Sequence, residues 1–518
     1  MIKVGWFKMK NIANIINFVR GCEPRVADDS FLFETLKKEL ELCEKFGFKS
    51  TVLFQYDALL DDRYIELVKE RQNLVEVGLW FEVVQPLCED CGFEWHGRFP
   101  WDWHNDVGFL VGYEPEQRIK IIDTAFEKFK DIFGYYPSVV GSWHIDAFSL
   151  NYMTEQYGIV ASCNCKEQCL TDGYTMWGGI YNGGYYPSRK NMLSPAQSKE
   201  NQIDVPVFRM LGADPIYQYD LGLGNPEKAQ KVSSLEPVYD NSGADENWVR
   251  WYLRENYNPK NIGFSYTQLG QENSFGWDKI SKGLPMQFEQ LNDKINNNEI
   301  ELMALGEAGK FFRESYSLTP CQSMCIDSDY TNADCKTLWY YSRFYRANTL
   351  YQKGKLWIRD IYIFDDNFEE KFLTVREETH DCEYSTLPVM DGYRYSRDGI
   401  RAGIYFCKDG EKVLFHGKYI SKKIDEKCSE ISIGNEVKIT FKENEILIEC
   451  PDNLTLNFEH AKCDTPYKKI EEKTLYLSYK NYDYSLKLGK GFFRENENGF
   501  FIEPEGGKTV LNFNGEKI

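Results

Sequence analysis

The chain has 518 residues, 42% of them hydrophobic, which is enough for two or three domains with separate cores. Its net charge of −19 argues against a nucleic acid or an anionic membrane as a partner, because both require a basic surface. The sequence contains no run of about 18 apolar residues, so we expect no membrane-spanning helix.

The fifteen cysteines are scattered along the chain, without the spacing of a small disulfide-bonded domain. Residues 1–15 show no apolar signal-peptide core. Free, mostly buried thiols in a reducing compartment account for both observations, so we expect a cytoplasmic protein. These features are also compatible with a homo-oligomer.

Strand-like and helix-like runs alternate along the first 365 residues. Strand-like runs lie at residues 2–9, 49–56, 74–84, 138–145, 159–165, 261–269 and 300–306. Helical patterns lie at residues 31–47, 61–72, 114–134, 149–158 and 284–298. About seven β/α units of this kind predict a parallel barrel or a doubly wound sheet.

Residues 166–260 interrupt this alternation with a stretch rich in glycine and aromatic residues, including "DGYTMWGGIYNGGYYP". Such a loop at a barrel mouth can provide aromatic rings that stack against sugars. Alternatively, it is a long loop whose aromatic side chains pack against one another and keep it ordered. After residue 357 the chain has no tryptophan, and residues 368–518 read as short alternating strands with turns such as "KDGE". We therefore predict a barrel domain, residues 1–365, followed by an antiparallel β-sandwich domain, residues 366–518.

The segment "GSWHIDAFSLNYM", residues 141–153, places an aspartate where a strand gives way to a helix. A carboxylate at such a strand end faces the side of an α/β barrel where chemistry is usually done. Alternatively, Asp146 caps the following helix, as aspartate often does. The segment by itself leaves both interpretations open.

The stretch "SWHIDAFS" resembles the motif of class II α-mannosidases, whose aspartate is a nucleophile and a zinc ligand, and Asp146 takes that place. Residues 112–159 are similar to a helix–strand–helix segment of the glycoside hydrolase/deacetylase superfamily. The whole layout resembles a two-domain gut-bacterial family of unassigned function. This resemblance implies a (β/α)7 barrel-like N-terminal catalytic domain followed by an all-β sandwich.

The metal ligands of these families are not matched. The first strand-like run, "VGWFKM", lacks the His-x-Asp pair of the mannosidases, and His104 and Asp106 supply those residue types only in a loop. Glu82 stands where the deacetylases would have a histidine. Cys88 and Cys91 lack the second ligand pair of a structural zinc site. We therefore expect no metal and no cofactor.

Glycoside hydrolysis needs two carboxyl groups that face each other across the glycosidic bond, and the acid needs a raised pKa. Glu272 is the most attractive acid, because it follows an apolar strand and has Phe275 and Trp277 close in sequence. Each single carboxylate can instead be a helix cap or part of an ion pair. The acids at predicted strand ends and in loops are Glu23, Glu82, Asp146, Asp214, Glu272 and Glu307.

The sequence thus predicts a glycosidase that acts on oligosaccharides or small glycosides at the C-terminal face of the barrel. Asp146 is the expected nucleophile or base and Glu272 the acid/base, with Glu82 as a substitute for either. The expected substrate-binding residues are Trp80, Trp103, Trp143, His144, Trp277, Asp214 and Glu307.

Two functions of other classes stay open. A non-catalytic carbohydrate-binding protein would use the same aromatic mouth without an aligned acid pair. A metal-dependent hydrolase of the α-mannosidase or deacetylase type would use Asp146 and His144 with His104 or Asp106. These alternatives differ in which side chains meet in space, and the sequence alone does not decide between them.

Overall fold

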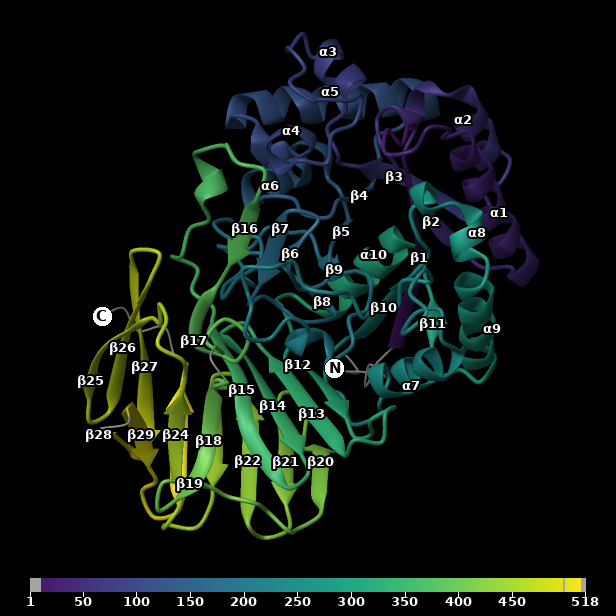
Figure 1. The fold of residues 1–518 in the computed structure, drawn as a ribbon. Helices are drawn as coiled ribbons and strands as arrows, with labels where there is room; N and C mark the ends of the chain where they lie inside the picture. Colours follow the sequence, from purple (N-terminus) through teal and green to yellow (C-terminus); the bar gives the residue numbers. More distant parts are fainter. Residues whose placement is uncertain (1–10, 398, 497–498, 514–518) are drawn as a thin grey trace, which may run out of the picture.

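The computed structural model describes residues 11–397, 399–496 and 499–513 (Figure 1). The first predicted strand, residues 2–9, lies outside the described residues. The barrel begins instead with β1 (Asn11–Val19), a buried apolar run that the sequence analysis did not single out. No helix in the described ranges is long and apolar enough to cross a membrane.

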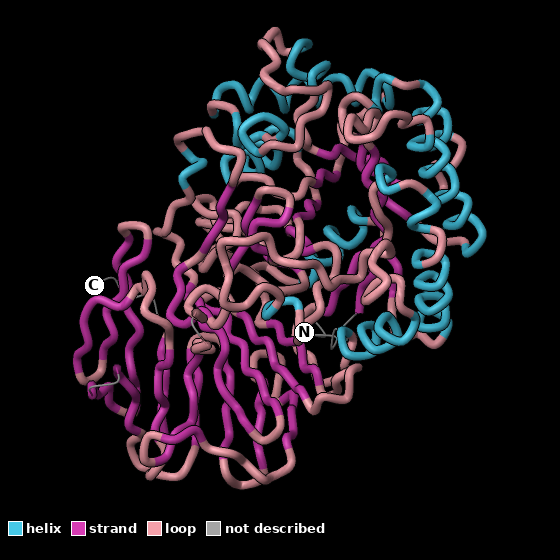
Figure 2. Tube along the Cα trace, in the orientation of Figure 1, coloured by secondary structure: helices cyan, strands magenta, loops and turns pink. Residues whose placement is uncertain are grey.

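A nine-stranded sheet forms a nearly closed barrel in the N-terminal region (Figures 1 and 2). Besides β1, its strands are β2 (Ser50–Phe54), β3 (Val75–Trp80), β4 (Val139–Gly141), β5 (Ala161–Asn164), β8 (Gly184–Tyr185), β9 (Val207–Arg209), β10 (Ser265–Leu269) and β11 (Glu301–Leu302). The order is β10–β1–β2–β3–β4–β5–β9–β8, and all neighbours from β10 to β9 are parallel. The carboxyl ends of these strands therefore meet at one face of the barrel.

Helices lie around the outside of this sheet (Figure 2). Their ends follow local sequence signals: α1 (Phe31–Phe46) ends at Gly47 with φ +67°, and α5 (Pro115–Phe133) begins with proline in its first turn and ends at Gly134 with φ +82°. The remaining helices are α2 (Asp62–Lys69), α3 (Gln85–Asp90), α4 (Asn105–Gly108), α6 (Ala147–Tyr157), α7 (Glu246–Asn256), α8 (Trp277–Ile280), α9 (Gly283–Asn296) and α10 (Leu305–Ser315). This arrangement confirms the predicted barrel-like α/β region.

Two antiparallel sheets pack face to face in the C-terminal region and form the predicted β-sandwich (Figure 1). The ten-stranded sheet contains β12 (Gln322–Ile326), β13 (Cys335–Tyr341), β14 (Tyr345–Gln352), β15 (Lys355–Ile363), β17 (Leu387–Asp391), β18 (Gly403–Lys408), β19 (Glu411–Lys412), β24 (Thr455–Glu459), β28 (Phe492–Asn496) and β29 (Gly499–Glu503). The eight-stranded sheet contains β20 (Tyr419–Lys423), β21 (Ser429–Ile433), β22 (Val437–Lys442), β23 (Glu445–Glu449), β25 (Tyr467–Glu471), β26 (Thr474–Tyr479), β27 (Tyr482–Lys490) and β30 (Lys508–Asn512). Strands such as β21 and β23 alternate buried and less buried residues, as expected for a sheet with one face in the core.

Between β15 and β17 the chain leaves the ten-stranded sheet and returns to the barrel; this stretch, residues 364–386, is called the joining segment below. In a small three-stranded sheet, β16 (Cys382–Ser385) pairs in parallel with β7 (Tyr174–Trp177), which also pairs with β6 (Gln168–Thr171). Tyr393 then packs on Trp177, with ring centroids 4.8 Å apart. Although β12–β15 precede residue 365, they lie in the ten-stranded sheet, and the division of the chain at that residue stays a prediction.

Candidate active site

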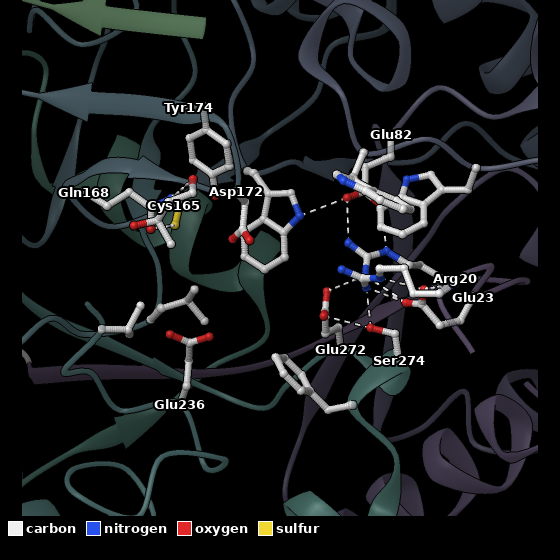
Figure 3. Close-up of a pocket in the computed structure, with 18 of the residues that line it drawn as sticks. Arg20, Glu23, Glu82, Cys165, Gln168, Asp172, Tyr174, Glu236, Glu272 and Ser274 are labelled. Atoms are coloured by element: carbon white, nitrogen blue, oxygen red, sulfur yellow. Dashed lines mark hydrogen bonds and ion pairs between the residues drawn. The ribbon is translucent and has the colours of Figure 1, made fainter. Parts of the chain in front are cut away.

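A cavity of about 400 Å³ lies at the carboxyl ends of the parallel strands (Figure 3). Arg20 directly follows β1, Glu82 and Trp143 lie two residues after β3 and β4, and Glu272 lies three residues after β10. Trp101 and Trp103, from the loop before α4, also line the cavity. Several charged and aromatic side chains therefore line one pocket at the C-terminal face of the barrel.

Arg20 is the centre of one side of the pocket, and its side chain is only 4% exposed. Its guanidinium donates to Glu82 through Nε (2.9 Å) and Nη2 (2.8 Å), and Nη1 lies 3.0 Å from Oε2 of Glu272. The ring of Trp101 covers the guanidinium at 4.0 Å. Burial lowers the pKa of Arg20, but the charges of Glu272 and Glu82 outweigh burial and raise it, so Arg20 stays a cation.

Glu82 is held on all sides. Its Oε1 accepts from Arg20 and from Nε1 of Trp143 (2.9 Å), and its Oε2 accepts from Arg20 and from Nε2 of Gln55 (2.7 Å). The side chain is fully buried. Because four hydrogen bonds occupy the carboxylate, Glu82 orients Arg20 and has little capacity left for a substrate.

Glu272 is less fully engaged. Its Oε1 accepts one hydrogen bond, from the hydroxyl of Ser274 (2.7 Å). Its Oε2 faces Arg20 as an ion pair but without hydrogen-bond alignment, since Nη1 donates to Ser274 instead. Burial raises the pKa of Glu272, with Arg20 opposing and the charge of Glu82 adding to the rise. A carboxyl group with these properties can hold a proton and deliver it inside the pocket.

Another part of the pocket lining carries a second group of charges (Figure 3). Nζ of Lys166 lies 2.9 Å from Oε2 of Glu236, which also accepts from the hydroxyl of Ser234 (2.6 Å). Asp172, in the turn between β6 and β7, also lines the pocket. The pocket thus offers charged groups from several elements to one bound molecule.

Asp146, the predicted nucleophile, lies outside this pocket. It is fully buried and caps α6, since its Oδ1 accepts from the backbone N–H of Ser149 (2.9 Å) and its Oδ2 from the Ser149 hydroxyl (2.7 Å). Nη1 of Arg118 lies 3.0 Å from Oδ1. Arg118 also donates to the carbonyls of Phe372 (2.6 Å) and Val375 (3.1 Å), so the cluster ties the joining segment to the barrel.

His144 and Trp80 are packed into the protein behind the pocket wall. His144 is 2% exposed, stacks on Phe109 with centroids 4.4 Å apart, and shares a hydrogen bond of 2.8 Å with Oδ1 of Asn105. Burial lowers the pKa of His144 to about 3, so the ring is neutral at physiological pH. Trp80 packs on Phe18 with centroids 4.4 Å apart and belongs to the barrel core.

The other predicted substrate-binding residues divide into two groups. Trp103 and Trp143 line the pocket, whereas Trp277 packs beside α1 with Nζ of Lys38 5.9 Å from its ring. Asp214 is buried in a turn, where it accepts from Nε1 of Trp248 (3.0 Å). Glu307 pairs with Lys49, which immediately precedes β2 and therefore lies at the amino end of the strands, away from the pocket.

The donor set does not fit the metal that a deacetylase or mannosidase site would require. Arg20 already occupies the position between Glu82 and Glu272 where a cation would sit, and the residues of the described ranges contain no group of three metal-ligating side chains. His104 stacks on His380 with centroids 3.7 Å apart instead of facing the pocket acids.

Sequence reasoning did not single out Arg20, Lys166, Glu236 and Asp172. Arg20 follows β1 as Glu82 follows β3, so the strand-end rule would have found it if residues 11–19 had been recognised as a strand. Asp172 lies in a hairpin turn inside the long insertion, where "TDG" marks a turn but says nothing of its orientation.

The chain is similar to one protein-family model and to several solved structures. A family model described as a domain of unknown function with a solved structure (DUF3863) matches residues 102–321, and no curated protein matches the chain. The chain is similar to a candidate glycoside hydrolase/deacetylase from Parabacteroides distasonis, at 15% identity and a TM-score of 0.54 over 73% of this chain and 91% of that chain. That likeness shows the barrel fold.

Two further solved structures are similar at lower scores. A candidate polysaccharide deacetylase from Mycobacterium smegmatis matches at 11% identity and a TM-score of 0.34, over 60% of this chain and 93% of that chain. A 4-α-glucanotransferase from Thermococcus litoralis matches at 12% identity and a TM-score of 0.31, over 97% of both chains.

Proposed function

We propose that this chain is a carbohydrate-processing hydrolase, specifically a glycosidase, and that the pocket around Arg20 is its active site. The observation that carries the proposal is Glu272: a carboxyl with a raised pKa that lines a tryptophan-walled pocket at the C-terminal face of a barrel. The pocket volume of about 400 Å³ lies in the usual range of small-molecule sites. The fold shared with the Parabacteroides protein named above supports the same reaction class.

In this proposal Glu272 donates its proton to the glycosidic oxygen as the bond to carbon breaks. Arg20 and Ser274 hold the carboxyl in place, and Glu82 fixes Arg20. The rings of Trp103 and Trp143 offer flat apolar surfaces to the apolar faces of a sugar.

Asp146 is not the nucleophile of this active site. Its carboxylate is sealed by Arg118 and Ser149, and a substrate would have to unfold the start of α6 to reach it. Glu82, the predicted substitute, is retained as a group that orients Arg20.

The test is hydrolysis of a panel of aryl glycosides and oligosaccharides, with products detected by mass. We expect Glu272→Gln to lower kcat by about 10²–10⁴-fold on substrates with poor leaving groups, the usual scale for losing a general acid. Glu289→Gln, at an exposed position on α9, is the matched control and should retain full activity. Equal activity of the two variants would contradict the assignment of Glu272.

A non-catalytic carbohydrate-binding protein is the second candidate. Arg20 already compensates both Glu82 and Glu272, an arrangement that would also suit binding without turnover. Glycan binding by the wild-type chain without any released product, measured by calorimetry and mass analysis, would favour this function over hydrolysis.

A further inference from the structure

The proposed glycosidase needs a second carboxyl group in the pocket, and neither of the predicted partners of Glu272 supplies it. Glu82 has its lone pairs occupied, and Asp146 is sealed. We propose that Asp172 is this second carboxyl, facing Glu272 across the pocket, and that Asn105 and His144 hold it in position. The inference rests on the proposed function and deepens it.

Asp172 is the carboxylate that the pocket leaves free. It is exposed and lines the cavity, and no described residue donates a hydrogen bond to it. In Figure 3 the labelled Asp172 lies to the upper left of Glu272, and the two residues line the same cavity. Nearby protein raises the pKa of Asp172, first by desolvation and then through the charge of Glu236.

The backbone at Asp172 adopts a conformation that few residues tolerate. Its φ is +56°, in the left-handed region, where aspartate and asparagine are the favoured residues after glycine. The next residue, Gly173, has φ +80°, and a Cβ there would lie 3.0 Å from Nδ2 of Asn105. The backbone of this turn therefore favours aspartate, asparagine or glycine at position 172 and glycine at position 173.

Asn105 stabilises this turn through hydrogen bonds to backbone carbonyls. Its Nδ2 donates to the carbonyls of Gly173 (2.8 Å) and His380 (2.7 Å), and the backbone N–H of Cys382 donates to the same Gly173 carbonyl (3.0 Å). The Asn105 amide group is thus oriented with its oxygen toward His144.

This orientation determines the protonation of His144. Because Oδ1 of Asn105 can only accept, Nε2 of His144 carries the proton and donates it at 2.8 Å. Nδ1 then has no hydrogen and no partner among the described residues. The neutral His144 ring therefore orients the Asn105 amide through one hydrogen bond, and Asn105 in turn holds the carbonyl of Gly173, next to Asp172, through another. Asn105 and His144 are positioning residues, and Asp172 is the group that acts on the substrate.

The reaction balances with these two groups. The proton of Glu272 moves to the leaving glycosidic oxygen, and the electron pair of the breaking carbon–oxygen bond leaves with that oxygen. If Asp172 attacks the anomeric carbon, a glycosyl ester forms; the ionised Glu272 then takes a proton from a water molecule, whose oxygen displaces Asp172 from that carbon. If Asp172 is instead the base, it takes a proton from the attacking water, and that proton passes to solvent while Glu272 takes one up from solvent.

The decisive experiment compares Asp172→Asn with Asp409→Asn. Asparagine keeps the left-handed turn, and Asp409 is an exposed turn residue with φ +50°, so the control makes the same change in the same backbone conformation. On a dinitrophenyl glycoside, which needs no acid, D172N should lose about 10³-fold or more in kcat, while Glu272→Gln loses little. If Asp172 is the nucleophile, azide should restore turnover of Asp172→Gly, which tolerates the left-handed backbone, and the product should be a glycosyl azide. The wild-type product should then keep the anomeric configuration of the substrate. Inversion by the wild type would identify Asp172 as the base.

The outcomes separate this inference from the function it rests on. A wild-type chain that hydrolyses no glycoside overturns both. An active wild-type chain with an equally active D172N, or with a loss confined to poor leaving groups, overturns only the role of Asp172.

The positioning role has its own readout. We expect His144→Ala to lower kcat about 10-fold or more with KM nearly unchanged, and His144→Gln, which can still donate to Asn105, to recover most of it. If both variants keep the wild-type kcat per folded molecule, His144 does not position the active site.

Discussion

Two arginine-centred carboxylate clusters of the barrel use the same residue types for different purposes. In one, Arg20 pairs with Glu82 and Glu272 beside a cavity of about 400 Å³. In the other, Arg118 pairs with Asp146, and both side chains are 0% exposed.

The difference lies in what covers each cluster. Arg118 donates to backbone carbonyls of the joining segment, and Glu370 of the same segment accepts from the N–H of Ala147 (2.7 Å), at the start of α6. Beside Arg20, by contrast, the ring of Trp101 lies over the guanidinium, and Arg20, Glu82 and Glu272 all line the cavity. A carboxylate that follows a barrel strand can therefore reach a substrate only where no distant segment covers it.

The largest expected difference is in turnover. Asp146→Asn should keep kcat within about threefold of wild type, whereas Glu272→Gln should lower it by about 10²–10⁴-fold, because only Glu272 lines the pocket. Steady-state kinetics on an unactivated glycoside measures both variants. A large loss for Asp146→Asn with a normal unfolding midpoint would show that the sealed cluster takes part in catalysis.

The second expected difference is in stability. Arg118→Met leaves the fully buried Asp146 without its cation, and breaking such a pair typically costs about 3–5 kcal/mol in unfolding free energy. Urea denaturation measures the change. A loss below about 1 kcal/mol would mean that the cluster contributes little to holding the joining segment, and the contrast between the two clusters would weaken.

A third prediction concerns pH. Burial lowers the pKa of His144 in the folded chain to about 3, below the usual value of 6.5. Between these two pH values the unfolded chain binds a proton at His144 and the folded chain does not. The contribution of the neutral His144 ring to the free energy of unfolding is complete above pH 6.5 and is lost as the pH falls toward 3. Between pH 7 and pH 5 the wild type should lose about 2 kcal/mol more than His144→Gln. Parallel pH profiles of the two unfolding midpoints would contradict this linkage.

The smallest expected effect is a change in KM, and it distinguishes Trp103 from Trp80, which the sequence analysis both predicted to bind substrate. Trp103→Ala should raise KM about 5-fold, since a stacking contact contributes about 1 kcal/mol, with kcat little changed. Trp80→Phe, in the core beside Phe18, should leave KM unchanged and reduce stability instead. The reverse pattern would show that the pocket is not where the sugar binds.

Much of the fold could be predicted from the sequence because its signals are local. The apolar spacing of α1, the proline that opens α5 and the glycines that end both helices are all readable within about 20 residues. The alternation of strands and helices, and the later change to short alternating strands, therefore indicated the barrel-like region and the β-sandwich. The sequence also singles out Glu272 and Trp103, because their neighbours indicate a strand end and an aromatic loop, and both line the pocket, while their roles stay predictions.

Only the tertiary structure decided which strand-end acids reach the pocket. Asp146 and Glu272 look alike in sequence, but residues 370–375, more than 200 positions later, cover the first and not the second. Asp172 lies in a turn whose direction depends on Asn105 and Cys382, which contact it from distant parts of the chain. The physical reason is that burial and hydrogen-bond partners decide what a carboxyl group can do, and both come from residues that no local pattern connects.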